Sequence, residues 1–311
     1  MSKEELQKNI LTTIAYYDAM DYPMTSFEVW KYLTRINGQD EDVDEKISLF
    51  DVLSELESDK LKNIIEEYRG FYFLRGQKDL VEQRNMRNKI SNSKYKTIVK
   101  IVRWLRFVPY VRMIAVSGRL AMKNAETKSD LDLLIVLKHR RIFIGRTLVT
   151  LVVHLLGKRR HGTKITNRAC LNYFITTKSL EINLKDVFSS SEYYFLVPVF
   201  GFRVFKKFQK QNQWIKKYKP NYQIEEIPHR EVVGETRLIR WIRKIGEVIF
   251  DLDILEKFLK NWQLRRIQAD PRTHLPGNVV IANDEMLIFL PEPHGPKIFD
   301  KFKDRLENLQ R

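Results

Sequence analysis

Residues 111–137, VRMIAVSGRLAMKNAETKSDLDLLIVL, decide the fold expected for this chain. The stretch begins and ends with apolar runs of the length of buried strands, and a Ser-Gly-Arg turn follows the first run. The second run opens with Asp130 and Asp132, which lie two residues apart and therefore project from one face of a strand. The pattern predicts, in order, a strand at 111–117, a helix at 118–126 and a strand at 130–137.

Two neighbouring carboxylates repel each other and resist joint ionisation, so their placement needs a reason. A divalent cation removes the repulsion, and Mg²⁺ (or Mn²⁺) is commonly held by one or two carboxylates together with substrate phosphates. Gly118 allows close backbone approach, and a helix that starts there directs free N–H groups at an anion. We therefore expect Asp130 and Asp132 to bind metal in a site for phosphoryl or nucleotidyl transfer.

The same tripeptide, Asp-Leu-Asp, recurs at 251–253 in a different context. It falls within a long apolar pattern of helical period at 236–268, where residues two apart point to different faces. We expect this second copy to be solvated helix surface. The comparison indicates that the glycine turn and the strand, and not the tripeptide itself, mark a site.

The net charge of +16 is distributed unevenly over the 311 residues. Residues 1–76 hold 9 Lys/Arg and 16 Asp/Glu, a net of −7, which leaves +23 for the remainder. A basic body of this kind favours a polyanionic partner, either nucleic acid or nucleotide phosphates. The single cysteine and the charged N-terminus, which has no apolar leader, favour a cytoplasmic protein with no membrane association.

Residues 1–76 predict three helices and a hairpin, the order of a winged helix, with Thr25 and Glu28 forming a capping box. DNA binding by this domain is disfavoured, because residues 40–59 carry nine acidic groups and one lysine and would repel phosphate. A packing or protein-contact role is the preferred interpretation of this acidic domain.

The rest of the chain divides into three parts. We expect two basic connecting helices at 77–110, an α/β core at 111–200 with a third strand at 169–176, and a basic, mainly helical domain at 201–311 that includes a hairpin at 279–290. The predicted class is therefore α+β, a mixed sheet with flanking helices between an N-terminal winged helix and a C-terminal helical domain.

The glycine turn, a ten-residue spacer (120–129) and the Asp-Leu-Asp-Leu segment together resemble the signature of the nucleotidyltransferase superfamily that includes DNA polymerase β. The likeness covers 111–137. It is weaker at 169–176 and in the flanks, which look like bacterial nucleotidyltransferase-domain proteins with an N-terminal winged helix. The resemblance implies an NTP substrate, Mg²⁺, and transfer of a nucleoside monophosphate to a hydroxyl group.

The resemblance also assigns residues and has two departures. Ser117, Gly118 and Arg119 would contact the triphosphate, although the family usually has Ser or Gly where Arg119 stands. The family's third carboxylate is missing from strand 169–176. Asn172, which we expect on one face with Cys170 and Phe174, is the nearest polar residue there, and an amide can bind a nucleotide or metal but cannot act as a base. A carboxylate would then have to come from elsewhere, and three candidates are Glu181, Asp186 and Glu192.

The basic loop GKRRHGTK (157–164) has the wrong order for a P-loop and follows a helix. Its cations are weak candidates for nucleic-acid contact, with an ordinary solvated loop as the equal alternative: Lys158, Arg159, Arg160 and Lys164.

The expected function is Mg-dependent transfer of a nucleoside monophosphate from an NTP to nucleic acid, such as an RNA 3′ end. Two alternatives stay open: a catalytically degenerate protein that binds nucleic acid or regulates, and a transferase that acts on a small molecule or a protein hydroxyl.

Overall fold

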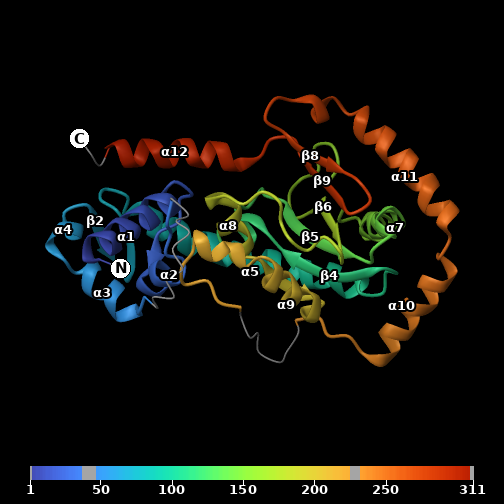
Figure 1. Cartoon of the computed structure of the whole chain (residues 1–311), viewed down its shortest axis with the longest axis horizontal. Helices are drawn as coiled ribbons and strands as arrows, with labels where there is room; N and C mark the ends of the chain where they lie inside the picture. The colour runs from blue at the N-terminus through green and yellow to red at the C-terminus, as the bar shows by residue number, and fades with distance from the viewer. Residues whose placement is uncertain (1, 37–46, 225–231, 309–311) are drawn as a thin grey trace.

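The computed structural model describes residues 2–36, 47–224 and 232–308. These residues form an α+β structure, the class predicted. It has two sheets, one of three strands and one of six. The small sheet belongs to the first 74 residues, and the large sheet draws strands from positions 111 to 290. Figure 1 shows both ends of the chain at the side where the small sheet lies.

The N-terminal part holds the predicted helices and hairpin in the predicted order. Its elements are α1 (Lys3–Asp18), β1 (Met24–Thr25), α2 (Ser26–Lys31), α3 (Leu49–Leu56), α4 (Asp59–Lys62), β2 (Ile65–Tyr68) and β3 (Phe71–Leu74). The sheet order is β1-β3-β2. The capping box is confirmed, because the Thr25 hydroxyl accepts from the Glu28 amide at 3.3 Å and the Glu28 carboxylate accepts from the Thr25 amide at 2.9 Å. The acidic residues 40–46 lie outside the described residues.

The large sheet has the strand order β7-β4-β5-β6-β9-β8. Its strands are β4 (Val111–Val116), β5 (Leu131–Leu137), β6 (Ala169–Thr176), β7 (Val197–Phe200), β8 (Val279–Ala282) and β9 (Met286–Leu290). Among the described strands, β5 and β6 form the only parallel pair, joined through α7 (Ile142–Leu155). The strands predicted near 111, 130 and 169 are confirmed, and the predicted C-terminal hairpin extends the same sheet.

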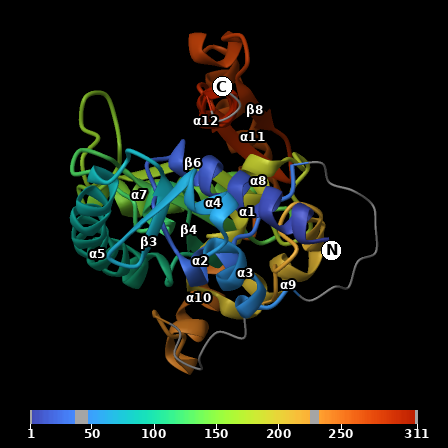
Figure 2. The ribbon, with the colours of Figure 1, turned by 90° about the vertical axis from the view of Figure 1, so that its left-hand side faces the viewer.

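Helices cover both faces of this sheet. One face packs under α5 (Asp79–Leu105) and α7. The other face packs under α8 (Val187–Tyr194) and α9 (Phe202–Gln211). Figure 2 shows α5 and α9 on opposite sides of β4. Asp132 alternates with the buried Leu131 and Leu133, which face α5, so its carboxylate lies on the α8 face.

The prediction of two basic helices at 77–110 is wrong, because α5 runs without a break for 27 residues. No Gly or Pro interrupts residues 79–105, so the chain has no local reason to end the helix. The helix predicted at 118–126 is also too long: α6 (Gly118–Ala121) is a single turn. The ten-residue spacer after Arg119 therefore reaches β5 mainly as irregular chain.

The long helix predicted at 236–268 is two helices, α10 (Arg237–Ile249) and α11 (Asp253–Gln268). The break falls on the second Asp-Leu-Asp copy. Its two carboxylates both pair with Arg141, which Asp253 contacts at 2.8 Å. The copy is exposed, as expected, but it binds a cationic side chain at a helix boundary instead of lying on a continuous helix.

The C-terminal segment wraps around the core, and Figure 1 shows α10 and α11 along its outer side. Two 3-10 turns lie in this half: η1 (Gln213–Lys217) follows α9, and η2 (Pro271–His274) lies between α11 and β8. The last helix, α12 (His294–Asn308), returns to α1. There the Arg305 guanidinium lies 3.0 Å from the buried Asp18 carboxylate and the Phe302 ring packs edge-on against Tyr16. The N-terminal and C-terminal parts are thus in direct contact.

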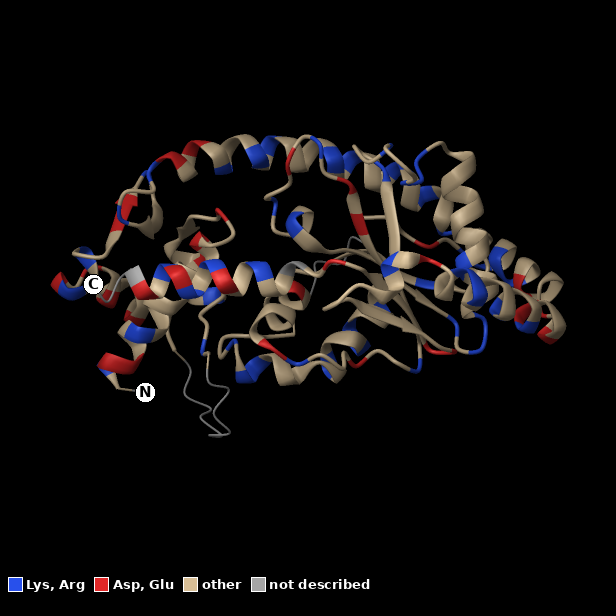
Figure 3. Ribbon diagram, turned by 90° about the horizontal axis from the view of Figure 1, so that it is seen from above, with Lys and Arg blue, Asp and Glu red and all other residues tan. Residues whose placement is uncertain are grey.

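Figure 3 shows Lys and Arg positions in blue along most of the ribbon, both near the ends of the chain and in the half of the molecule far from them. Within the described residues, no helix has both the length and the apolar character needed to cross a membrane.

Candidate metal and nucleotide site

Asp130 and Asp132 stand where β5 begins, beside the turn that ends β4. The Ser117 amide donates to the Asp132 carbonyl at 3.2 Å, which fixes the turn against the strand. Gly118 has a φ of 63°, and a Cβ at this position would lie 3.1 Å from Oδ2 of Asp132. The glycine is therefore required both for its backbone conformation and for the space beside the carboxylate.

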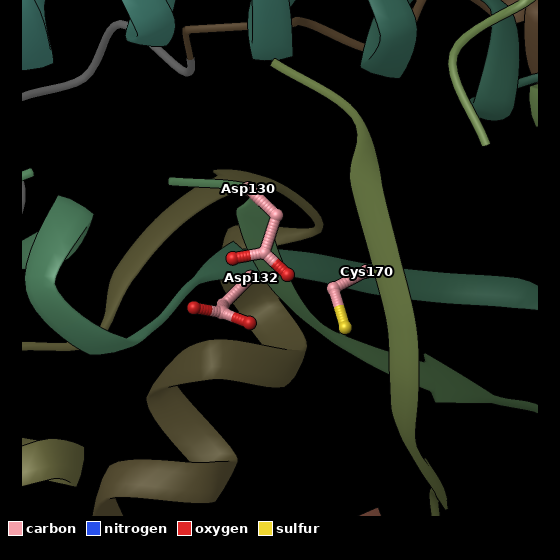
Figure 4. A group of neighbouring side chains, drawn as sticks. All are labelled: Asp130, Asp132 and Cys170. Atoms are coloured by element: carbon pink, nitrogen blue, oxygen red, sulfur yellow. The ribbon is translucent and has the colours of Figure 1, made fainter. Parts of the chain in front are cut away.

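Cys170 of β6 completes a group of three side chains with the two aspartates. One ligand atom from each of Asp130, Asp132 and Cys170 lies within 4.8 Å of the other two. Figure 4 shows the two carboxylates one above the other, with the Cys170 thiol reaching in from the neighbouring strand. The sequence places Cys170 on the strand predicted at 169–176 but does not predict this contact, because the contact depends on the pairing register of β6.

A bulge in β6 decides which residue faces the aspartates. Cys170 pairs with Asp132, but the next pair is Leu134 with Tyr173, so β6 has one extra residue there. The bulge reverses the alternation, and Phe174 packs on the α5 face. The expectation that Cys170, Asn172 and Phe174 share a face is therefore wrong, and Cys170 is the residue directly opposite Asp132.

The Asp132 carboxylate carries the electrostatic strain expected beside a like charge. Burial raises the pKa of Asp132 to about 7, and the charges of Asp130 and Glu192 add to the shift. Burial and the two aspartates also raise the pKa of the Cys170 thiol to about 12. At neutral pH the thiol is protonated, and the pair of aspartates readily keeps a proton when no cation is bound.

Arg160 is the described cation closest to this pair. The basic loop turns back onto β6, where the Arg160 amide donates to the Ala169 carbonyl at 3.1 Å. Its guanidinium then lies 2.5 Å from Oδ2 of Asp130 and 3.4 Å from the Cys170 sulfur. A residue predicted as a weak nucleic-acid contact is thus an ion-pair partner of a candidate metal ligand. The other three cations of this loop, Lys158, Arg159 and Lys164, are half-buried or exposed.

Lys94 of α5 supports the loops that lead into β5 and β6. Its side chain is 3% exposed. Its ammonium donates to the carbonyls of Thr127 and Ser129 at 3.1 and 2.7 Å and to the Asn167 amide oxygen at 2.9 Å. Burial lowers the pKa of Lys94 while the charge of Asp130 opposes the shift. Sequence reasoning missed this residue, because one buried lysine among seven α5 cations has no local signature.

Arg119 pairs with carboxylates in this structure. It contacts Glu126 of the spacer and lies 3.8 Å from Asp21 of the N-terminal part. Its predicted contact with phosphate would require the guanidinium to leave these partners. Because α6 is a single turn, its helix dipole attracts the phosphates of a nucleotide less strongly than the dipole of the longer predicted helix would.

Of the three acids proposed to supply a further carboxylate, Glu192 is the one whose charge reaches Asp132. It is half-buried on α8, and burial together with the charge of Asp186 raises its pKa to about 7. Asp186 itself caps α8 by accepting from the Ser189 amide at 2.6 Å. Glu181 is exposed and pairs with Lys185 at 2.6 Å.

A scan against protein-family models finds no match to this chain, and searches among curated proteins and solved structures find no significant match.

Proposed function

We propose that this protein is a nucleotidyltransferase that, with the help of Mg²⁺, moves a nucleoside monophosphate from an NTP to a hydroxyl acceptor. The acceptor oxygen bonds to the α-phosphorus, the bond between the α- and β-phosphates breaks, and pyrophosphate leaves. In this proposal the six-stranded sheet is a nucleotidyltransferase core and the acidic N-terminal part is a winged helix with a packing or protein-contact role. The acceptor is nucleic acid, because the chain after residue 76 carries a net charge of +23.

One observation carries the proposal: Asp130 and Asp132 project together beside the Gly118 turn, which lies close against Asp132. Burial and the charges of Asp130 and Glu192 disfavour the ionised form of Asp132 and raise its pKa to about 7. Two half-buried like charges at a strand end gain nothing from packing, so a ligand of opposite charge is the simplest reason for them.

The donor set fits a hard cation. Two carboxylates together with substrate phosphates are the usual ligands of Mg²⁺, whereas a thiolate would favour softer metals. Cys170 keeps its proton at neutral pH, since its pKa is raised to about 12, and a thiol is a poor ligand. Asp130 and Asp132 would therefore hold Mg²⁺ or Mn²⁺, and the thiol would line the site.

The chain's own residues would bind the phosphates and accept the proton of the attacking hydroxyl. A bound Mg²⁺ would neutralise charge on the triphosphate. Ser117 and Gly118 would receive the phosphates at the turn. Glu192, with a pKa of about 7, would accept the proton of the attacking hydroxyl, since a base works best when its pKa lies near the operating pH.

A second function, binding without catalysis, is favoured by one observation. The Arg160 guanidinium contacts Asp130 at 2.5 Å, so a fixed cation stands where a metal would neutralise that charge. If Arg160 stays in place when nucleotide is present, the protein is a nucleotidyltransferase-fold protein without catalytic activity that binds nucleic acid or regulates a partner.

Transfer of label from α-labelled NTPs tests the enzyme. The protein would be incubated with each NTP, Mg²⁺ and, in separate reactions, RNA, protein and small hydroxyl acceptors. We expect labelled product that Asp130→Asn abolishes. Absence of label from every acceptor, with no difference between wild type and Asp130→Asn, would favour the binding function.

A further inference from the structure

A cavity of about 820 Å³ is lined by residues of α5, of α6 and of the first position of β7. Leu120 and Ala121 of α6 form part of its wall. The first residue of the same turn, Gly118, touches Asp132, and a turn of four residues is only about 6 Å long. The cavity is on the α5 side of the sheet and the Asp132 carboxylate is on the α8 side, so a molecule in the cavity would reach the aspartates by passing the end of the sheet at α6.

The cavity is basic, and its cations have no acidic partners within the described part of the chain. Lys96, Lys100 and Arg103 line it from α5, and Lys123 lines it from the spacer. All four are exposed, and no described carboxylate lies within ion-pair distance of any of them. No Asp or Glu among the described residues lines the cavity. In the N-terminal half of α5, by contrast, Arg84 and the buried Arg87 are paired with acids.

The spacing of these cations suits an extended polyanion. Lys96, Lys100 and Arg103 follow one another on adjacent turns of α5 and cover about 10 Å along its axis. A single phosphate group needs only one or two of them, whereas successive phosphates of a strand would engage all three.

Apart from Ser91 and Asn92, the rest of the lining is apolar or aromatic, with Tyr95, Val99 and Val197 beside the α6 residues. The bases of a duplex are stacked inside it and its phosphates face outward, so a duplex would make no base contacts with this apolar lining. An unpaired strand can place bases against aromatic and apolar side chains while its phosphates meet the cations.

We propose that this cavity is the acceptor site and that it holds the end of a single-stranded nucleic acid, with Lys96, Lys100, Arg103 and Lys123 at the phosphates. The direction of the strand toward Asp130 and Asp132 rests on the proposed transferase function. The binding itself does not require catalysis and can be measured separately.

The test is fluorescence anisotropy of a short labelled single-stranded RNA in EDTA without NTP, between about 50 and 200 mM salt. Four phosphate contacts predict about a 50-fold loss of affinity over this range. The triple variant Lys96→Gln/Lys100→Gln/Arg103→Gln should show only about a threefold loss. The matched control removes three exposed charges from α9 (Lys206→Gln/Lys207→Gln/Lys210→Gln) and should behave as the wild type does.

An unchanged salt dependence in the α5 variant would overturn the acceptor site, and so would equal binding of duplex RNA or full competition by free NTP. Intact RNA binding that the α5 variant weakens, in a protein that transfers no label, would support the cavity while refuting the transferase. The two failures are thus distinguishable.

Discussion

Replacement of Lys94 by methionine should destabilise the protein, because the buried ammonium joins three segments around the carboxylate site. Its three hydrogen bonds go to Thr127, Ser129 and Asn167. At about 1.5 kcal/mol for each bond from a charged donor, their loss removes 4 to 5 kcal/mol. The apolar methionine regains about 1.5 kcal/mol by burial. We expect the free energy of unfolding to fall by about 3 kcal/mol.

Urea unfolding followed by circular dichroism measures this change. The matched control is Lys89→Met, which removes an exposed charge from the same helix and should stay within about 0.5 kcal/mol of the wild type. If Lys94→Met and Lys89→Met unfold at the same urea concentration, the three hydrogen bonds do not hold the loops that carry Asp130, and the reasoning fails.

Three further predictions concern the site itself. The pKa of Asp132 is raised from 3.8 to about 7 in the folded state, so the stability contributed by its protonated carboxyl is present below pH 4 and is lost as the pH rises through 7. In EDTA, the free energy of unfolding of Asp132→Asn should therefore rise relative to that of the wild type by up to about 4 kcal/mol between pH 4 and 8. Parallel stability curves for the two proteins would argue against the raised pKa. Arg160→Gln should tighten Mn²⁺ binding about two- to fivefold by freeing Asp130 from a partly exposed ion pair, and calorimetry that finds weaker binding would contradict this. Glu192→Gln should lower the rate of transfer at least 100-fold with little change in KM for the NTP, whereas a full rate would exclude Glu192 as the base.

The strands at the site could be predicted from the sequence because each is a short apolar run that is buried along most of its length. Residues 111–116 and 131–137 are almost wholly buried, so the apolar pattern and the secondary structure agree. The positions of Gly118, Asp130 and Asp132 relative to those strands follow from chain order alone, which is why their juxtaposition could be predicted.

The partners of the aspartates could not be predicted, because they come from segments that are distant in sequence. Arg160 reaches Asp130 only because a loop folds back onto Ala169, and Cys170 faces Asp132 only because β6 pairs in one register before its bulge. Helix boundaries failed for a related reason. The break near residue 250 coincides with the pairing of Asp251 and Asp253 with Arg141, a tertiary contact that no local pattern records.

Metal binding tests the central claim most directly. Binding of Mn²⁺ would be followed by electron paramagnetic resonance in the wild type, in Asp130→Asn and Asp132→Asn, and in Asp251→Asn/Asp253→Asn as the matched control for the same tripeptide. We expect wild type and control to bind alike and each single variant at the β5 site to bind at least about tenfold more weakly. Equal binding by all four proteins, or loss of binding only in the control, would contradict a metal site at Asp130 and Asp132.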